Sequence, residues 1–171
     1  MAAIWHRGDM VIRPAYACDR GWISRTLAQR WGSTMIVTRG RFCDAASLAA
    51  LVAVETTSEQ APERVGLMTY RLDRGGLEVV TLDALRIGAG IGTALLSNGV
   101  RIARDAGAAR VWLITTNDNL RAISFYERLG FRVIAVHEGA VDLARLLKPS
   151  IPLVAENGIE LHDELELELT V

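Results

Sequence analysis

The sequence has few cysteines and histidines and no long apolar run. It has 2 cysteines, Cys18 and Cys43, whose spacing matches neither a zinc site nor a Cys-x-x-Cys redox motif. Its 3 histidines are isolated from one another and from any acidic cluster with metal-ligand spacing. No apolar run approaches the roughly 20 residues of a membrane-spanning helix, and residues 1–10 lack the apolar stretch of a secretory signal. We therefore expect a cytoplasmic protein with no metal and no membrane partner.

An excess of charge of one sign is missing too. The 19 Lys and Arg residues are balanced by 20 Asp and Glu residues, so no basic surface for nucleic acid is predicted. Half of the 171 residues are hydrophobic, which is enough for a sizeable core. The chain also contains no internal repeat, low-complexity block or linker. These features predict a single domain over residues 1–171.

The hydrophobic pattern predicts short strands alternating with helices. Residues 51–55 and 65–72 are expected to form an antiparallel hairpin with a polar loop at 56–63. Trp22 and Trp31 fall on the inner face of the first helix, where they either pack in the core or line a pocket. The expected strands are 10–13, 34–38, 51–55, 65–72, 77–82, 111–115, 131–137 and 159–170, and the expected helices are 19–31, 92–105, a segment from 119 to about 130, and 141–148.

The last expected strand, residues 159–170, alternates leucine with glutamate. Its acidic side chains, Glu164, Glu166 and Glu168, are most simply a solvated strand face. Alternatively, they line an opening that attracts cationic amine substrates. As an unpaired edge, this strand could also support a homodimer.

A glycine-rich turn follows the strand at 77–82. Gly88, Gly90 and Gly92 precede a helix whose first amides have no internal partner, so the turn can cradle a phosphate. Tight backbone packing is the alternative. The turn does not fit a Walker motif, because Gly92-Thr93 lacks the lysine, nor the G-x-G-x-x-G dinucleotide fingerprint.

A second motif follows downstream, and together the two resemble the GNAT superfamily of N-acetyltransferases. Gly90-Ile91-Gly92 matches the end of its Q/R-x-x-G-x-G/A turn, although the Gln/Arg position falls on Ile87. A pyrophosphate would then rest chiefly on backbone amides, assisted by Arg86 or Arg101. The family's Asn-x-x-Ala-x-x-Phe-Tyr-x-x-x-Gly-Phe motif is matched at every fixed position, by Asn119, Ala122, Phe125, Tyr126, Gly130 and Phe131.

The resemblance covers residues 77–131 and implies an α/β (α+β) fold. Its mixed, mostly antiparallel sheet is flanked by helices and splayed between the strands ending near Leu82 and Thr115, with acetyl-CoA in the gap. The implied activity is transfer of an acetyl group from acetyl-CoA to a primary amine of a small molecule or peptide, by direct attack. The implied cofactor-binding residues are Leu82, Asp83, Ala84, Ile87, Gly88, Ala89, Gly90, Ile91, Gly92, Thr93, Asn119 and Phe125.

Two catalytic residues follow from the same resemblance. Tyr126 occupies the general-acid position, although a tyrosine beside Phe125 could equally be a packed core aromatic. The family's catalytic glutamate aligns with Gly76, and Glu78, two residues along and on the same face of the strand feeding the turn, is the candidate general base. The alternative is a solvated, idle glutamate. Weaker candidates are Asp83, Glu55, His137 and a chain of waters. Asn119 could cap a helix, bind the cofactor, or do both.

Two other functions remain open at the level of sequence. A catalytically silent acyl-CoA-binding sensor or assembly module would fit the absent Gln/Arg at position 87. A nucleotide-binding regulatory domain is disfavoured by the failed phosphate-binding fingerprints. The sequence contains no diagnostic pattern for the acceptor.

Overall fold

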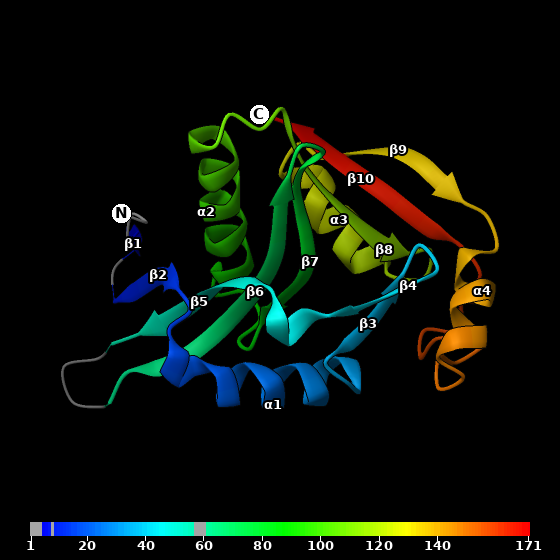
Figure 1. The fold of residues 1–171 in the computed structure, drawn as a ribbon, viewed down its shortest axis with the longest axis horizontal. Coiled ribbons are helices and arrows are strands. Elements are labelled where there is room, and N and C mark those ends of the chain that lie inside the picture. Colours follow the sequence, from blue (N-terminus) through cyan, green and yellow to red (C-terminus); the bar gives the residue numbers. More distant parts are fainter. Residues whose placement is uncertain (1–4, 8, 57–60) are drawn as a thin grey trace.

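The computed structural model, which describes residues 5–7, 9–56 and 61–171, is built on an eight-stranded mixed sheet (Figure 1). The strand order is β1-β2-β5-β6-β7-β8-β10-β9, and all neighbours are antiparallel except β7 and β8. Strands β3 and β4 form a separate hairpin. The expected mixed, mostly antiparallel fold with flanking helices is therefore confirmed.

The elements have the following bounds. The strands are β1 (Trp5–Arg7), β2 (Met10–Pro14), β3 (Met35–Thr38), β4 (Arg41–Asp44), β5 (Ala49–Glu55), β6 (Glu63–Asp73), β7 (Gly76–Ala84), β8 (Arg110–Thr116), β9 (Arg132–His137) and β10 (Glu164–Thr170). The helices are α1 (Arg20–Trp31), α2 (Ile91–Asp105), α3 (Leu120–Arg128) and α4 (Ala140–Leu147). No helix in the described part of the chain is long and apolar enough to cross a bilayer.

The two faces of the sheet carry separate hydrophobic clusters. Because successive side chains of a strand point to opposite faces, Leu67 and Met68 of β6 support different helices. Leu67 packs in a cluster with Ile23 and Leu27 of α1, whereas Met68 packs in the larger cluster with Leu95 of α2. Helices α1 and α2 are thus held on opposite faces, and the sheet between them is buried (Figure 1).

Strands β7 and β8 run side by side only at their beginning. Their parallel pairing ends at Val79 and Leu113, although β7 continues to Ala84 and β8 to Thr116. A bulge in the β6–β7 pairing leaves Val80 without a residue opposite it and bends β7 at this point. The expected splay is therefore present, and the β8-facing backbone edge of residues 80–84 has no strand partner among the described pairings.

The C-terminal strand departs from expectation in three ways. It covers residues 164–170 rather than 159–170, and it is not an edge, because β8 and β9 pair with its two sides. Its acidic face is not solvated, since Glu164 and Glu166 are only 3% and 6% exposed. The physical reason is that the β3–β4 hairpin reaches over this face (Figure 1). A dimer through an unpaired edge of β10 therefore loses its structural basis.

Of the hairpins β3–β4 and β5–β6, the sequence predicted only β5–β6. The β5–β6 pairing is confirmed, although residues 57–60 of its loop lie outside the described residues. In contrast, the sequence did not reveal β4, whose residues show no clear hydrophobic alternation. The two-residue turn that joins β3 to β4 has left-handed backbone at both Arg39 (φ 51°) and Gly40 (φ 67°).

Candidate active site

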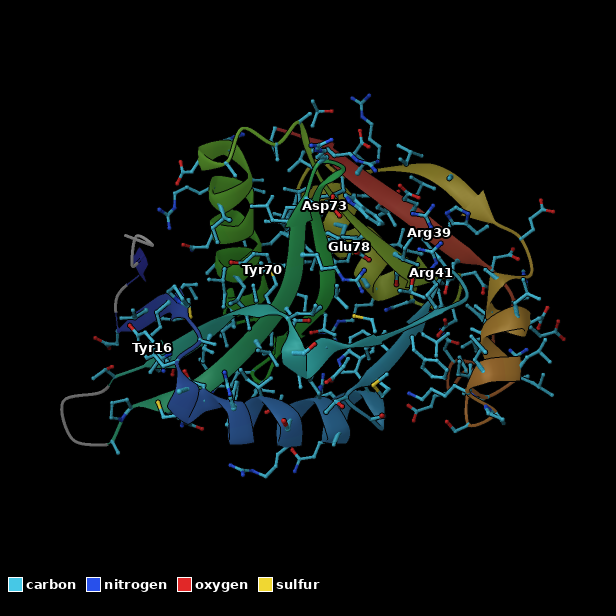
Figure 2. All side chains as sticks on the ribbon, in the orientation of Figure 1. Tyr16, Arg39, Arg41, Tyr70, Asp73 and Glu78 are labelled. Atoms are coloured by element: carbon cyan, nitrogen blue, oxygen red, sulfur yellow. The ribbon has the colours of Figure 1, made fainter. Side chains whose placement is uncertain are left out.

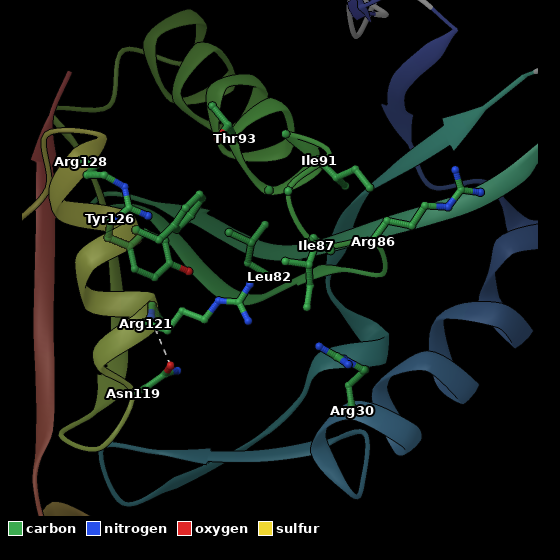
Figure 3. Close-up of a pocket in the computed structure, with 16 residues that line it drawn as sticks. Arg30, Leu82, Arg86, Ile87, Ile91, Thr93, Asn119, Arg121, Tyr126 and Arg128 are labelled. Atoms are coloured by element: carbon green, nitrogen blue, oxygen red, sulfur yellow. Dashed lines mark hydrogen bonds between the residues drawn. The ribbon is translucent and has the colours of Figure 1, made fainter. Parts of the chain in front are cut away.

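The larger cavity, about 590 Å³, opens where β7 and β8 diverge (Figure 3). It is bounded by the end of β7, the glycine turn, and the face of α3. Its lining includes most of the residues expected to bind a cofactor, together with Tyr126. The full set is Arg30, Leu82, Ala84, Arg86, Ile87, Gly88, Gly90, Ile91, Gly92, Thr93, Asn119, Arg121, Ala122, Phe125, Tyr126 and Arg128.

The glycine turn shapes one wall of this cavity. Gly88 and Gly90 have φ of 78° and 75°, a left-handed conformation that favours glycine. Gly90 is the N-cap of α2, and its carbonyl accepts a hydrogen bond from the Ala94 N–H at 3.0 Å. The N–H groups of residues 91–93, in the first turn of α2, therefore have no intrahelical acceptor. Gly92 lies against Phe125, whose ring would be 3.3 Å from an added Cβ. The turn therefore presents backbone donors where an anion could bind.

Asn119 fixes the start of α3. Its Oδ1 accepts from the Ala122 N–H at 3.3 Å, and its Nδ2 donates to Thr115 Oγ1 at 3.2 Å. The capping role expected from the sequence is confirmed. These contacts join the start of α3 to the end of β8. The contact of Asn119 with a cofactor stays a prediction.

Tyr126 lies at the inner wall of the cavity. Its ring packs against Phe125 and Phe131, with centroids 5.1 and 5.5 Å away. Its hydroxyl points into the cavity in Figure 3. Burial, together with the nearby Asp83 carboxylate, raises the pKa of the phenol well above its ordinary value. Tyr126 is thus both a core aromatic and a protonated group facing the cavity.

The arginines of the cavity differ from those expected. Arg86 is ion-paired with Glu55 and Glu63 and extends away from the cavity centre in Figure 3. Arg101 donates to Asn98 Oδ1 at 3.0 Å and does not line the cavity. Instead, Arg121 and Arg128 of α3 provide positive charge. Arg121 and Arg128 lie four residues before and three residues after Phe125, so all three share one helical face. This spacing could have identified both arginines as cavity residues.

Two of the expected cofactor-binding residues, Asp83 and Ala89, do not line the cavity. The Asp83 carboxylate faces α1, where it accepts hydrogen bonds from Trp31 Nε1 at 2.9 Å and Arg30 Nε at 3.4 Å. Burial raises the pKa of Asp83, and these two donors oppose that shift. Any contact between Asp83 and a cofactor would therefore involve its backbone.

A second, smaller cavity of about 120 Å³ lies on the hairpin side of the splay. Glu78 lines this cavity and not the larger one that Tyr126 lines, and Figure 2 shows it on β7. Asn119 lines both. The remaining lining residues are Trp31, Ile36, Val37, Thr38, Val79, Val80, Ile114, Thr115, Thr116 and Glu164. Trp31, at 40% exposure, is therefore a pocket residue rather than a core one.

Glu78 is buried, so the interpretation of it as a solvated glutamate is wrong. Burial raises the pKa of its carboxyl group, while Arg71, with Nη1 at 3.4 Å from Oε2, partly opposes this. The weaker base candidates are occupied elsewhere: Glu55 pairs with Arg86, and His137 Nε2 lies 3.2 Å from Glu166 Oε2. Neither lines the two cavities described here.

Comparisons with known proteins agree with this geometry. The chain is 40% identical over 158 residues to the uncharacterized protein YdhI of Bacillus subtilis (strain 168), covering 91% of this chain and 95% of that protein. Its fold is similar to that of an IAA acetyltransferase from Bacillus cereus ATCC 14579, with a TM-score of 0.68 and 20% identity, covering 95% and 99% of the two chains.

The fold is also similar to that of a GNAT family acetyltransferase from Elizabethkingia anophelis, whose crystal structure has acetyl-CoA bound. In that comparison the TM-score is 0.64 at 18% identity, covering 96% of this chain and all of the other. Residues 28–131 match the acetyltransferase (GNAT) family model. This chain therefore belongs to the GNAT family of acetyltransferases.

Proposed function

We propose that this protein transfers an acetyl group from acetyl-CoA to a primary amine, by direct attack in a ternary complex. The observation that carries the proposal is the larger cavity, where the unpaired edge of β7, the amides of the glycine turn and the Tyr126 hydroxyl meet. The acetyl-CoA bound to the Elizabethkingia neighbour supports it.

The residues present fit coenzyme A. The first amides of α2, together with Arg121 and Arg128, suit a pyrophosphate, because both supply donors and positive charge. The β8-facing backbone edge of β7 suits the amide-containing pantetheine arm, since it offers main-chain donors and acceptors with no strand partner. When bound, acetyl-CoA supplies the activated thioester.

The chain's own groups can handle the charges of the reaction. An amine with an ordinary pKa of about 10.4 must lose its proton before it attacks. We assign Glu78 to accept that proton, because its raised pKa makes it a stronger base than an ordinary glutamate. Backbone N–H groups of β7 in the splay can stabilise negative charge that develops on the carbonyl oxygen.

Tyr126 is assigned to protonate the departing thiolate. The raised pKa keeps the Tyr126 phenol protonated, so it has a proton to donate to the departing sulfur as the carbon–sulfur bond breaks, although as an acid it is weaker than a thiol with an ordinary pKa of about 8.5. The two cysteines, one exposed and one buried, line neither cavity, and they therefore offer no nucleophile for a covalent acyl intermediate there.

Two measurements test the proposal. Calorimetry should detect acetyl-CoA binding, and thiol release should depend on an added primary amine, with the acetylated amine identified by mass spectrometry. Binding without transfer to any amine of a broad panel would contradict the enzyme assignment. That outcome would favour the silent acyl-CoA-binding module, which the exposed Ile87 in place of Gln or Arg would suit.

A further inference from the structure

The smaller cavity contains a buried carboxylate that has no side-chain ion pair among the described residues, although Arg39 and His137 act on it from a longer distance. Glu164 is only 3% exposed and lines the cavity. Its Oε2 accepts a hydrogen bond from the backbone N–H of Arg39 at 3.0 Å. Within the described residues, no basic side chain lies within ion-pair distance of it. A buried charge without a counter-charge is costly, which points to a cation that arrives with a ligand.

The other carboxylates on the same side of the sheet have partners. Glu166 lies 3.3 Å from Arg110 Nη1 and 3.2 Å from His137 Nε2, and Glu168 lies 2.7 Å from the same Arg110 atom. Glu78 is 3.4 Å from Arg71. Glu164 is therefore distinguished from its neighbours by its missing cation and not merely by its negative charge.

An unpaired hydroxyl in the same cavity supports a ligand independently. Thr38, on β3, also lines the cavity, and its Oγ1 is buried with no hydrogen-bond partner in the described part of the chain. Buried polar atoms usually have a partner, and one that lacks it points to a group that binds there. An ammonium has three donors and no acceptor, so one group could satisfy both Glu164 and Thr38.

On the basis of the proposed acetyl transfer, we propose that Glu164 selects an acceptor carrying a second, retained positive charge. The amine that attacks must be neutral, so it cannot itself supply the cation that Glu164 lacks. The charge must come from another group of the same molecule. A cavity of about 120 Å³, the volume of roughly four waters, suits a short aminoalkyl group. The acceptor class is therefore a compact diamine or a similar amine with a cationic end.

A series of matched acceptors tests this charge selection. We would compare 1,4-diaminobutane, 1-aminobutane and 4-aminobutanoate, which present a positive, a neutral and a negative end on the same carbon chain. The expected kcat/KM for the diamine exceeds that for 1-aminobutane by about tenfold or more, as for a hydrogen bond to a charged group. The aminobutanoate should be the poorest acceptor.

Two variants separate charge from packing. Glu164→Gln retains an oxygen for the Arg39 N–H and nearly the same shape but loses the charge, so the preference for the diamine over 1-aminobutane should fall to about twofold or less. Glu168→Gln is the matched control, since Glu168 lies on the same face of β10 and lines neither cavity. It should retain the full preference.

A binding measurement makes the outcome independent of turnover. Calorimetry on the wild-type protein saturated with CoA should show tighter binding of 1,4-diaminobutane than of 1,4-butanediol, its uncharged isostere, by about tenfold or more, because only the diamine brings a cation to Glu164. Equal binding of the diamine and the diol would overturn the inference, as would a preference for the diamine as acceptor that survives in Glu164→Gln. Selective binding of the diamine without transfer of acetyl to any amine would support the cation site at Glu164. It would contradict the proposed acetyltransferase activity. Because the comparison can be made in the wild type alone, the test holds even if the variant fails to fold.

Discussion

The backbone N–H of Arg39 donates a 3.0 Å hydrogen bond to Oε2 of Glu164, joining residues 125 positions apart. Arg39 has φ of 51° and is the one non-glycine residue of the described chain with positive φ, a conformation that costs about 1–2 kcal/mol. Its guanidinium also lies 5.7 Å from the ring centroid of Trp112. These contacts hold the tip of the β3–β4 hairpin, where Figure 2 shows Arg39, against β10 and β8. Thr38 of this hairpin lines the smaller cavity.

Replacing Tyr126 with phenylalanine should lower kcat at least about a hundredfold, because the thiolate would depart without its proton donor. The dissociation constant of acetyl-CoA should change little, since the ring and its packing are kept. Steady-state thiol release and calorimetry measure the two quantities. Tyr70→Phe is the matched control, because Tyr70 lines neither cavity. A Tyr126→Phe enzyme with wild-type kcat would remove the general-acid role.

The glycine turn can be tested with two substitutions of equal backbone strain. Gly88 (φ 78°) and Gly107 (φ 69°) are both left-handed, and an added Cβ would meet nothing within 4 Å at either. Gly88→Ala and Gly107→Ala should each lower the free energy of unfolding by about 1–2 kcal/mol. Only Gly88→Ala should weaken acetyl-CoA binding, because Gly107 lies outside the cavity. Unchanged binding in Gly88→Ala would argue against the turn as the anion site.

The assignment of positive charge to α3 predicts different effects for two arginines. Arg121→Gln should weaken acetyl-CoA binding about tenfold at low ionic strength, and less at high salt, because a charged contact with phosphate is lost. Arg101→Gln should leave the dissociation constant nearly unchanged, since Arg101 does not line the cavity. Calorimetry at two salt concentrations provides both comparisons. If Arg101→Gln weakened acetyl-CoA binding and Arg121→Gln did not, the pyrophosphate contact would belong to Arg101, as the sequence suggested.

The pH dependence of kcat/KM should report the proposed base. Burial raises the pKa of Glu78 above the ordinary glutamate value, so the acidic limb of the profile should lie above about pH 4.3. Activity should fall as the pH drops through that raised pKa, because a protonated carboxyl cannot accept the proton of the amine. Glu78→Gln should lose this limb and lower kcat about a hundredfold or more. An unaltered profile in the variant would assign the base elsewhere.

A buried carboxylate far from the cavities should control acid stability. Asp19 is fully buried between Arg13 and Arg64, with contacts of 2.6 and 2.7 Å. These partners and the Tyr16 N–H hold the pKa of Asp19 well below its usual range. Its stabilising contribution is therefore complete above the unfolded-state pKa of about 3.9 and is lost as the pH falls toward the folded-state value.

Asp19→Asn should accordingly lower the free energy of unfolding by about 3–5 kcal/mol at neutral pH, with the difference from wild type shrinking below about pH 4. Urea unfolding over a pH series measures this. The control is Asp142→Asn, which removes a more exposed ion pair with Arg145 and should cost about 1 kcal/mol or less. A difference that stayed constant down to pH 2 would show that the charge of Asp19 is not the cause.

Two motifs in the sequence, through their resemblance to the GNAT family, were enough to predict the mixed, splayed sheet and the larger cavity. The glycine turn, the Asn119 cap and the Phe125-Tyr126 pair lie within contiguous segments, so their geometry follows from short-range structure. The burial of Glu164 could not be predicted in the same way. It depends on the Arg39-Gly40 turn placing a distant hairpin over β10, and on β10 pairing on both sides.

The arginines illustrate the same limit. Arg86 immediately precedes the glycine turn, yet Glu55 and Glu63 from β5 and β6 hold its guanidinium. This pairing depends on the tertiary arrangement, which spacing along the chain does not reveal. Arg121 and Arg128, in contrast, could have been identified by following the α3 face that carries Phe125.

The position of β10 also constrains how the chain can be synthesised and folded. β8 and β9 emerge from the ribosome before β10, yet each pairs with β10 and not with the other. Until residue 170 has been translated, both strands present open hydrogen-bonding edges to other nascent chains. Premature termination before residue 164 would thus yield an aggregation-prone fragment that also lacks the carboxylate proposed to select the acceptor.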